Sequence, residues 1–85
     1  MKEFKYVITD PEGIHARPAG LLVKQAAGYK SDIKIGKNEK MADAKRIFGV
    51  MGLGVKTGEE IVMTAEGEDE DTAITELEEF FKANL

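Results

Sequence analysis

The spacing of apolar side chains predicts four short strands. Residues 2–9 alternate apolar with polar or charged side chains, and they place Phe4, Tyr6 and Ile8 on one face, which is typical of a half-buried strand. The turn residues DPEG at 10–13 close this first strand. Similar short runs predict three further strands, at residues 32–36, 40–43 and 59–67.

After the first turn, the apolar residues change to a helical period. Between residues 16 and 27 they recur at intervals of three and four, and Gly28 supplies a stop. The segment 45–55 is apolar but rich in glycine, and it predicts a short helix at 47–52 followed by a loop around Gly54. The pattern of the first helix is carried by Ala19, Leu22, Val23 and Ala26.

An amphipathic segment near the end of the chain predicts a third helix, with Asp69 or Asp71 as its cap. Its apolar face consists of Ala73, Ile74, Leu77 and Phe81. The resulting order is βαββαβα, and helices gathered on one face of an antiparallel sheet form an α+β two-layer domain. The 85 residues suffice for one domain, 1–85, but leave little room for a deep cavity, so chemistry is expected at the surface.

Charge is distributed unevenly along the chain. Residues 1–56 carry eleven Lys/Arg and six Asp/Glu, a balance of +5, whereas residues 57–85 carry one Lys and ten acids, a balance of −9. There is no basic stripe with interleaved aromatic residues, which argues against a nucleic-acid partner. The basic half is nevertheless suited to attracting an acidic protein.

The chain contains no cysteine, which excludes disulfides and thiolate metal sites and fits the cytosol. The opening residues MKEFKYVIT lack the apolar core of a signal peptide, and no apolar run approaches the length of a membrane span. We therefore expect a cytoplasmic protein that does not insert directly into a membrane.

The only histidine lies in the motif GIHARPAG, residues 13–20. His15 is the expected N-cap of the first helix, so Ala16, Arg17 and Pro18 take its first three positions, where proline is tolerated. The free N–H groups of Ala16 and Arg17 form an anion site, and this helix end favours a neutral, nucleophilic imidazole. The guanidinium of Arg17 can grip phosphate oxygens in a fork geometry.

A lone histidine in a small domain is more often a surface or capping residue, but these neighbours favour phosphoryl transfer, in which positioning and charge stabilisation dominate. The sequence shows no glycine-rich phosphate loop and no carboxylate set for magnesium. The domain should therefore receive a phosphoryl group from one protein and pass it to another. We expect no cofactor, no metal and no turnover catalysis by this chain alone.

The motif GIHARPAG resembles the active-site signature of the HPr family, the histidine-containing phosphocarriers of the bacterial phosphoenolpyruvate-dependent sugar phosphotransferase system. IFGVMGLGVKTGEEI and AEGEDEDTAITELEEFF are similar to later family segments. The resemblance implies an open-faced β-sandwich, in which three helices cover one side of a four-stranded antiparallel sheet. It also implies that Nδ1 of His15 carries phosphate from enzyme I to the IIA domains of sugar permeases, with Arg17 beside the phosphate.

The sequence departs from the family pattern at Arg46, where low-GC Gram-positive members carry a regulatory serine phosphorylated by a dedicated kinase. Conventional serine regulation is therefore not expected here. Val50 and Leu53 are expected to be buried. Partners are expected to dock on a patch beside His15, made of Gly20, Leu21, Lys24, Arg46, Ile47, Phe48 and Met51. Arg17, Lys24, Lys45 and Arg46 are expected to form its basic rim.

Two other functions are compatible with this sequence. A regulatory paralogue of the family would act mainly by binding other proteins. A small hydrolase on a similar frame, such as an acylphosphatase-like enzyme, would need an asparagine or carboxylate near Arg17 to position water. The only asparagines are Asn38 and Asn84, and neither is expected to neighbour Arg17. The carrier is preferred, and a monomer is expected because a carrier docks transiently.

Overall fold

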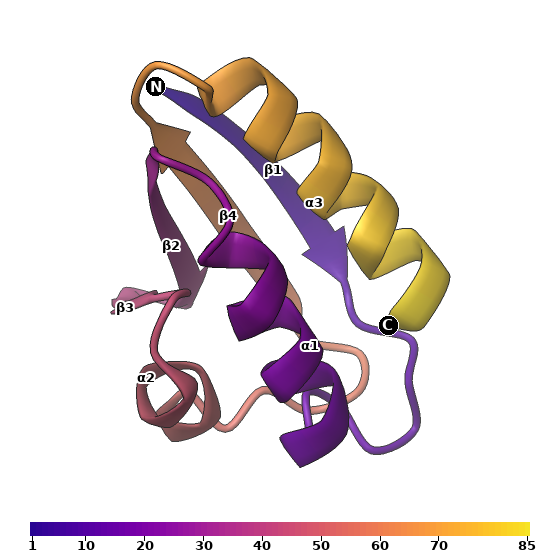
Figure 1. Ribbon diagram of the computed structural model, residues 1–85. Coiled ribbons are helices and arrows are strands. Elements are labelled where there is room, and N and C mark those ends of the chain that lie inside the picture. Colours follow the sequence, from indigo (N-terminus) through magenta and orange to yellow (C-terminus); the bar gives the residue numbers. More distant parts are fainter.

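The computed structural model describes residues 1–85 and places all seven predicted elements in the order βαββαβα (Figure 1). The strands are β1 (Lys2–Val7), β2 (Asp32–Lys37), β3 (Lys40–Asp43) and β4 (Glu60–Glu66). The helices are α1 (Ala16–Ala26), α2 (Ile47–Gly52) and α3 (Glu70–Asn84). None of these helices combines the length and apolar character needed to span a membrane.

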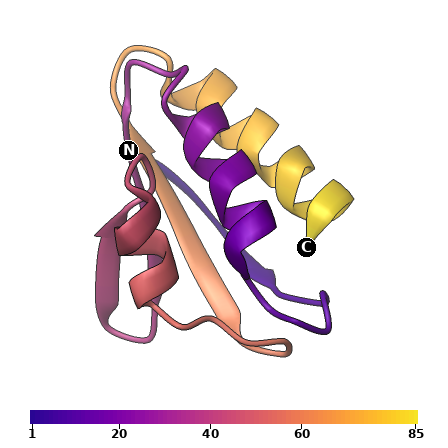
Figure 2. The same ribbon diagram turned by 60° about the horizontal axis from the view of Figure 1, so that its bottom comes forward.

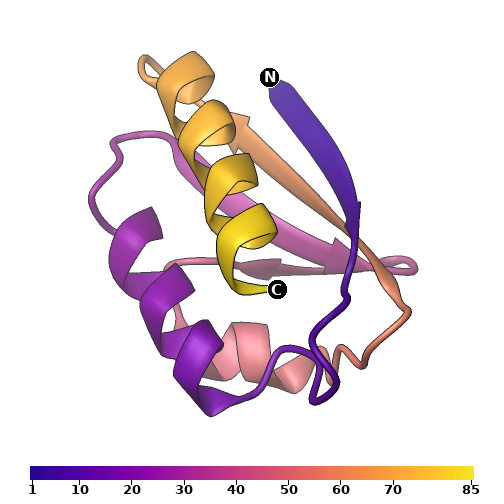
Figure 3. The same cartoon turned by 90° about the vertical axis from the view of Figure 1, so that its right-hand side faces the viewer.

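The four strands form one antiparallel sheet in the order β1-β4-β2-β3. All three helices lie on one face of this sheet, as the side view in Figure 3 shows. Alternate residues of β4 point toward the helices, so Ile61, Met63 and Ala65 are buried. This arrangement confirms the expected α+β open-faced sandwich.

The core lies between the sheet and the helices. α1 buries Ala19, Leu22 and Ala26, and α3 buries Ala73, Leu77 and Phe81. The ring of Phe81 meets those of Phe4 and Tyr6 edge to face, each at a centroid distance of 5.7 Å. Val50 and Leu53 are buried as predicted, whereas Ile47, Val23 and Ile74 are only partly buried against this core.

α1 lies between the other two helices and runs antiparallel to both (Figure 2). At its start, Ile14 donates its N–H to the Val55 carbonyl, which follows α2. Beyond its end, the Tyr29 carbonyl accepts a 2.9 Å hydrogen bond from Lys45 Nζ, which precedes α2. The end of α2 therefore lies beside the start of α1, where the histidine motif is.

Two helix ends differ from the predicted capping. Gly28 follows α1 but is not among the glycines with positive φ, so it does not form a left-handed cap. Asp69 is the N-cap of α3 by position, yet its side chain makes no cap hydrogen bond. Its carboxylate instead accepts hydrogen bonds from Ser31 and from the Lys30 N–H, and the Ser31 hydroxyl contributes most to lowering the Asp69 pKa. This contact ties the start of α3 to the loop before β2.

Candidate functional site

His15 is the N-cap of α1, as predicted. Its backbone is extended, with φ −92° and ψ −177°, and its carbonyl accepts the Ala19 N–H at 3.0 Å. The imidazole makes no side-chain cap hydrogen bond and is 35% exposed. The N–H groups of Ala16 and Arg17 have no partner within the helix, because the carbonyls four residues earlier belong to the preceding loop. The ring and these two donors are therefore available at the same helix end.

The loop that carries His15 is fixed from two sides. The backbone oxygen of Leu85 accepts the N–H groups of Thr9 and Asp10 at 2.6 and 2.9 Å. Ile14 is buried, and its N–H bonds to the Val55 carbonyl at 3.0 Å. β1 therefore ends at Val7 and not at residue 9 as predicted, because the N–H groups of Thr9 and Asp10 bond to Leu85 and not to a neighbouring strand.

Gly13 is required by the backbone of this loop. Its φ is +68°, and a Cβ at this position would lie 2.3 Å from the Val55 carbonyl oxygen and 2.7 Å from Lys56 Cα. We expect Gly13→Ala to lower the free energy of unfolding by about 2–3 kcal/mol, since it combines left-handed strain with a backbone clash. Urea unfolding followed by circular dichroism measures this loss.

Gly20 provides the matched control for that substitution. It lies within α1, and no heavy atom is within 4 Å of an added Cβ. Gly20→Ala should therefore raise the free energy of unfolding by about 0.5–1 kcal/mol, because alanine favours the helix. Equal stability of the two variants would show that Gly13 is not constrained as described.

Two carboxylates face the imidazole, and they were not anticipated from the sequence. Nε2 of His15 lies 3.4 Å from Glu12 Oε2 and 3.6 Å from Asp10 Oδ2. The other Asp10 oxygen, Oδ1, accepts the Glu12 N–H at 2.8 Å and so orders the turn. A proton on Nε2 would face both carboxylates, and Nδ1 would then be the ring nitrogen with a free lone pair.

The same three side chains form the only group that could converge on a cation. Asp10, Glu12 and His15 each offer one ligand atom, and these atoms lie within 4.8 Å of one another. A direct imidazole–carboxylate contact accounts for the same geometry. The cluster by itself therefore does not define a metal centre.

A shallow hollow of about 260 Å³ lies next to the histidine. Arg17 is exposed there and forms no ion pair, so its guanidinium is free to meet an anion. Asn84 also lines the hollow, which corrects the expectation that no asparagine neighbours Arg17; its amide donates to the Phe80 carbonyl at 2.9 Å. The lining residues are Asp10, His15, Arg17, Pro18, Leu21 and Asn84.

The predicted docking residues lie on the outer surfaces of α1 and α2, which pack against each other. Phe48 is 88% exposed, and Leu21 and Met51 are also exposed large apolar side chains. Gly20 leaves open space beside them. A side chain as exposed as Phe48 contributes almost nothing to the core, so Phe48, Leu21 and Met51 form an exposed apolar surface on α1 and α2.

The basic rim is smaller than predicted. Lys45 does not belong to it, because its ammonium is held by the Tyr29 carbonyl past the end of α1. Arg46 is 81% exposed, lies 3.7 Å from Asp43, and makes no side-chain cap hydrogen bond at the start of α2. Since α1 and α2 are antiparallel, Arg46 lies at the opposite end of the patch from His15.

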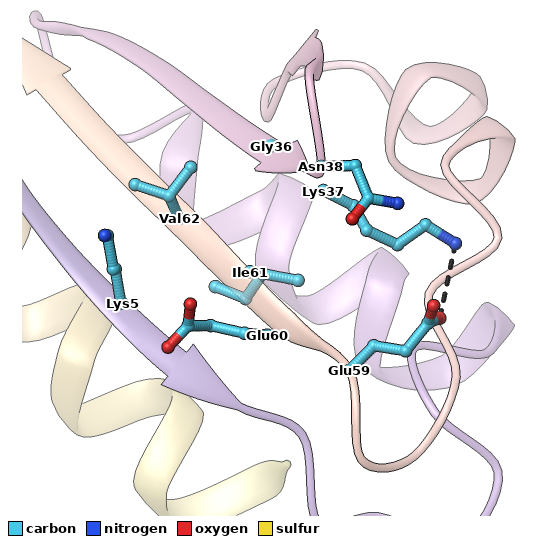
Figure 4. A pocket seen from close by; sticks show the side chains of 8 residues that line it. All are labelled: Lys5, Gly36, Lys37, Asn38, Glu59, Glu60, Ile61 and Val62. Carbon is cyan, nitrogen blue, oxygen red and sulfur yellow. Dashed lines mark hydrogen bonds and ion pairs between the residues drawn. The ribbon is translucent and has the colours of Figure 1, made fainter.

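A second hollow opens where β1, β4 and the end of β2 meet (Figure 4). Lys37 forms an ion pair of 3.2 Å with Glu59 at its edge, and Lys5 and Glu60 lie across it. None of the predicted site residues lines it. The residues predicted to take part in phosphoryl transfer, His15 and Arg17, therefore lie at the hollow beside the start of α1 and not at this one.

Comparison with known proteins gives one family. The family model for the PTS HPr component phosphorylation site matches residues 2–83. The phosphocarrier protein HPr of Mycoplasma capricolum is 44% identical over 79 residues, which cover 93% of this chain and 89% of that protein. The HPr structure of Thermoanaerobacter tengcongensis is 41% identical with a TM-score of 0.93, and covers 98% of this chain and 93% of that one.

A regulatory relative is also similar. The structure of Crh, the Bacillus subtilis catabolite repression protein, is 36% identical to this chain with a TM-score of 0.78. The alignment covers 100% of this chain and 98% of Crh. Crh was crystallised as a dimer with a swapped domain, so this fold also occurs in dimers.

The fold and the comparisons define the class of this protein as a small histidine phosphocarrier. The chain belongs to the HPr family of the phosphotransferase system. It is thus a phosphocarrier and not a free-standing catalyst, in a family that works with enzyme I and IIA proteins.

Proposed function

We propose that His15 carries the phosphoryl group of this phosphocarrier on Nδ1. The observation that carries the proposal is the geometry of its ring, which is accessible at the start of α1 and has Nε2 directed toward Asp10 and Glu12. The Nδ1 lone pair attacks the phosphorus held by enzyme I. A phosphorus–Nδ1 bond forms as the bond to the donor breaks, and the proton stays on Nε2.

The start of α1 supplies positive charge for this transfer. The N–H groups of Ala16 and Arg17 and the Arg17 guanidinium are placed to contact the phosphoryl oxygens. Preorganised donors of this kind stabilise a phosphoryl group in transit without a metal in this chain. Labelling with enzyme I and phosphoenolpyruvate, followed by mapping of the modified residue, tests the assignment. The label should be acid-labile and base-stable.

We propose the exposed face of α1 and α2 as the docking surface for enzyme I and for IIA domains. Both partners must bring a reacting group to His15, and Leu21 of this face lines the same hollow as His15. Its apolar centre is flanked by the cations of Arg17 and Lys24, with Arg46 at the far end. We also propose that the protein acts in the cytoplasm as a monomer, because a carrier docks its partners only transiently. The residues assigned to it are Gly20, Leu21, Lys24, Arg46, Ile47, Phe48 and Met51.

Phe48→Ala is expected to raise the KM of enzyme I for this protein about tenfold with little change in kcat, since an exposed aromatic anchor is lost on docking. Steady-state labelling at varied carrier concentration measures both constants. Met41→Ala is the control, because Met41 is a large exposed apolar residue on β3, outside the docking surface. An unchanged KM in Phe48→Ala would contradict the proposed docking surface.

The similarity to Crh favours a second candidate function, that of a regulatory protein that acts mainly by binding other proteins. Such a protein would bind its partner whether or not His15 is phosphorylated. A pull-down with phosphorylated and unphosphorylated protein separates the two roles. We place the carrier first, because the His15 ring and Arg17 line one accessible hollow at the start of α1.

A further inference from the structure

The two carboxylates at His15 face Nε2, so neither of them touches the ring nitrogen that is proposed to attack phosphorus. Asp10 is well placed because its N–H is anchored to Leu85 and its side chain is only 22% exposed. Glu12 is nearer to Nε2 but is 74% exposed. Both approach the ring nitrogen opposite the one proposed to carry phosphate. Their effect must therefore reach the phosphoryl group through the ring.

The protonation of Nε2 decides how readily Nδ1 releases a phosphoryl group. In transfer to an acceptor, the phosphorus–Nδ1 bond breaks, its electron pair returns to Nδ1, and phosphorus bonds to the acceptor nucleophile. If Nε2 keeps its proton, the leaving group is a neutral imidazole. If Nε2 has lost it, the leaving group is an imidazolate anion, which is far more basic and leaves more slowly.

We propose that Asp10 and Glu12 are positioning residues that keep Nε2 protonated while Nδ1 carries the phosphoryl group, and so sustain transfer near neutral pH. A carboxylate that accepts an N–H favours the charged form of the donor. The proposal rests on the proposed function, since it requires phosphate on His15. It assigns to the acidic turn a role in the second half of the carrier cycle, the donation to IIA.

The other groups around the ring do not replace this effect. Arg17, from α1, lines the same hollow but bears the opposite charge, so it cannot favour a proton on Nε2. Asn84, from α3, adds no charge, and the backbone oxygen of Leu85, which follows α3, already accepts hydrogen bonds from Thr9 and Asp10. The two carboxylates of the turn are thus the anions directed at Nε2. Because Glu12 is exposed, its electrostatic effect on Nε2 should weaken as salt is added.

The test compares Asp10→Asn, Glu12→Gln and the double variant with wild type. Asparagine at position 10 can still accept the Glu12 N–H, so the turn is kept while the charge is removed. Each protein is phosphorylated through enzyme I and isolated, and its transfer to an IIA domain is followed from pH 5.5 to 9. Glu66→Gln, at the far end of β4, is the control for loss of a surface carboxylate.

In the double variant we expect transfer near pH 7.5 to slow about tenfold, because the two negative charges that face Nε2 and favour its protonated form are removed. The difference should vanish at low pH, where Nε2 is protonated in every variant. In the unphosphorylated protein, ¹⁵N NMR should show the Nε2–H tautomer in wild type and a larger Nδ1–H fraction in the double variant.

Failure of this inference is distinguishable from failure of the proposed function. If wild type is labelled on His15 but the pH profile of the double variant coincides with it, the roles of Asp10 and Glu12 are refuted while the carrier site stands. If wild type takes no label on His15, the proposed function is refuted, and this inference with it.

Discussion

His15→Ala should abolish phosphorylation by enzyme I and phosphoenolpyruvate. His15 is the only histidine of the chain, and the other residues around the hollow offer no nitrogen nucleophile that could replace it. Incorporation of ³²P from labelled phosphoenolpyruvate measures the loss directly. Wild type should take up one phosphoryl group per chain, labile in acid and stable in base, and the variant none.

The loss should not arise from unfolding. The imidazole makes no cap hydrogen bond and is partly exposed, so we expect its removal to change the free energy of unfolding by only about 0.5 kcal/mol. Urea unfolding of the variant at the same midpoint as wild type would show that the variant is folded. Base-stable label that persists in a folded His15→Ala variant would place the phosphoryl group elsewhere and contradict the proposed site.

Arg17→Ala should slow phosphoryl transfer about 100-fold, because loss of one preorganised donor to a charged transition state typically has that effect. The reduction should fall mainly on kcat, since the guanidinium acts on the phosphoryl oxygens in transit. Arg17→Lys keeps the charge but not the fork geometry, and it should give an intermediate rate. Rapid-quench measurement of a single turnover gives each rate without the contribution of product release.

Lys24→Ala is the matched control for Arg17→Ala. It removes one positive charge from the exposed face of the same helix but lies outside the hollow around His15. It should affect mainly KM, and the effect should shrink at high salt. Equal changes in kcat for the two variants would show that Arg17 acts only through the overall charge of this face.

Much of the fold follows from local patterns. The start of α1 at Ala16 could be predicted because an N-cap residue is followed by early helical positions that tolerate proline. It could be predicted that Val50 is buried and Phe48 is exposed, because residues two apart in a helix lie on different sides of it. The order of the strands could not be predicted in this way, because periodicity shows which face of a strand is buried but not which strands are neighbours. β1 pairs with β4, more than fifty residues later.

The unpredicted parts of the site depend on contacts between distant segments. The sequence pattern marks Asp10 and Glu12 only as turn residues, although Glu12 and His15 are three residues apart, a spacing that allows a side-chain contact. Asp10 is oriented by Leu85, and Asn84 reaches the hollow from the same helix end. Lys45 was expected in the basic rim because of its charge, but the packing of α2 on α1 brings it to the Tyr29 carbonyl.

The most direct test of the central claim is NMR of the ¹⁵N-labelled, phosphorylated protein. If His15 carries the phosphoryl group as proposed, its Nδ1 resonance should show coupling to ³¹P, and its Nε2 should retain a proton near neutral pH. Coupling of ³¹P to Nε2, or a phosphoryl group bound to any residue other than His15, would contradict the account.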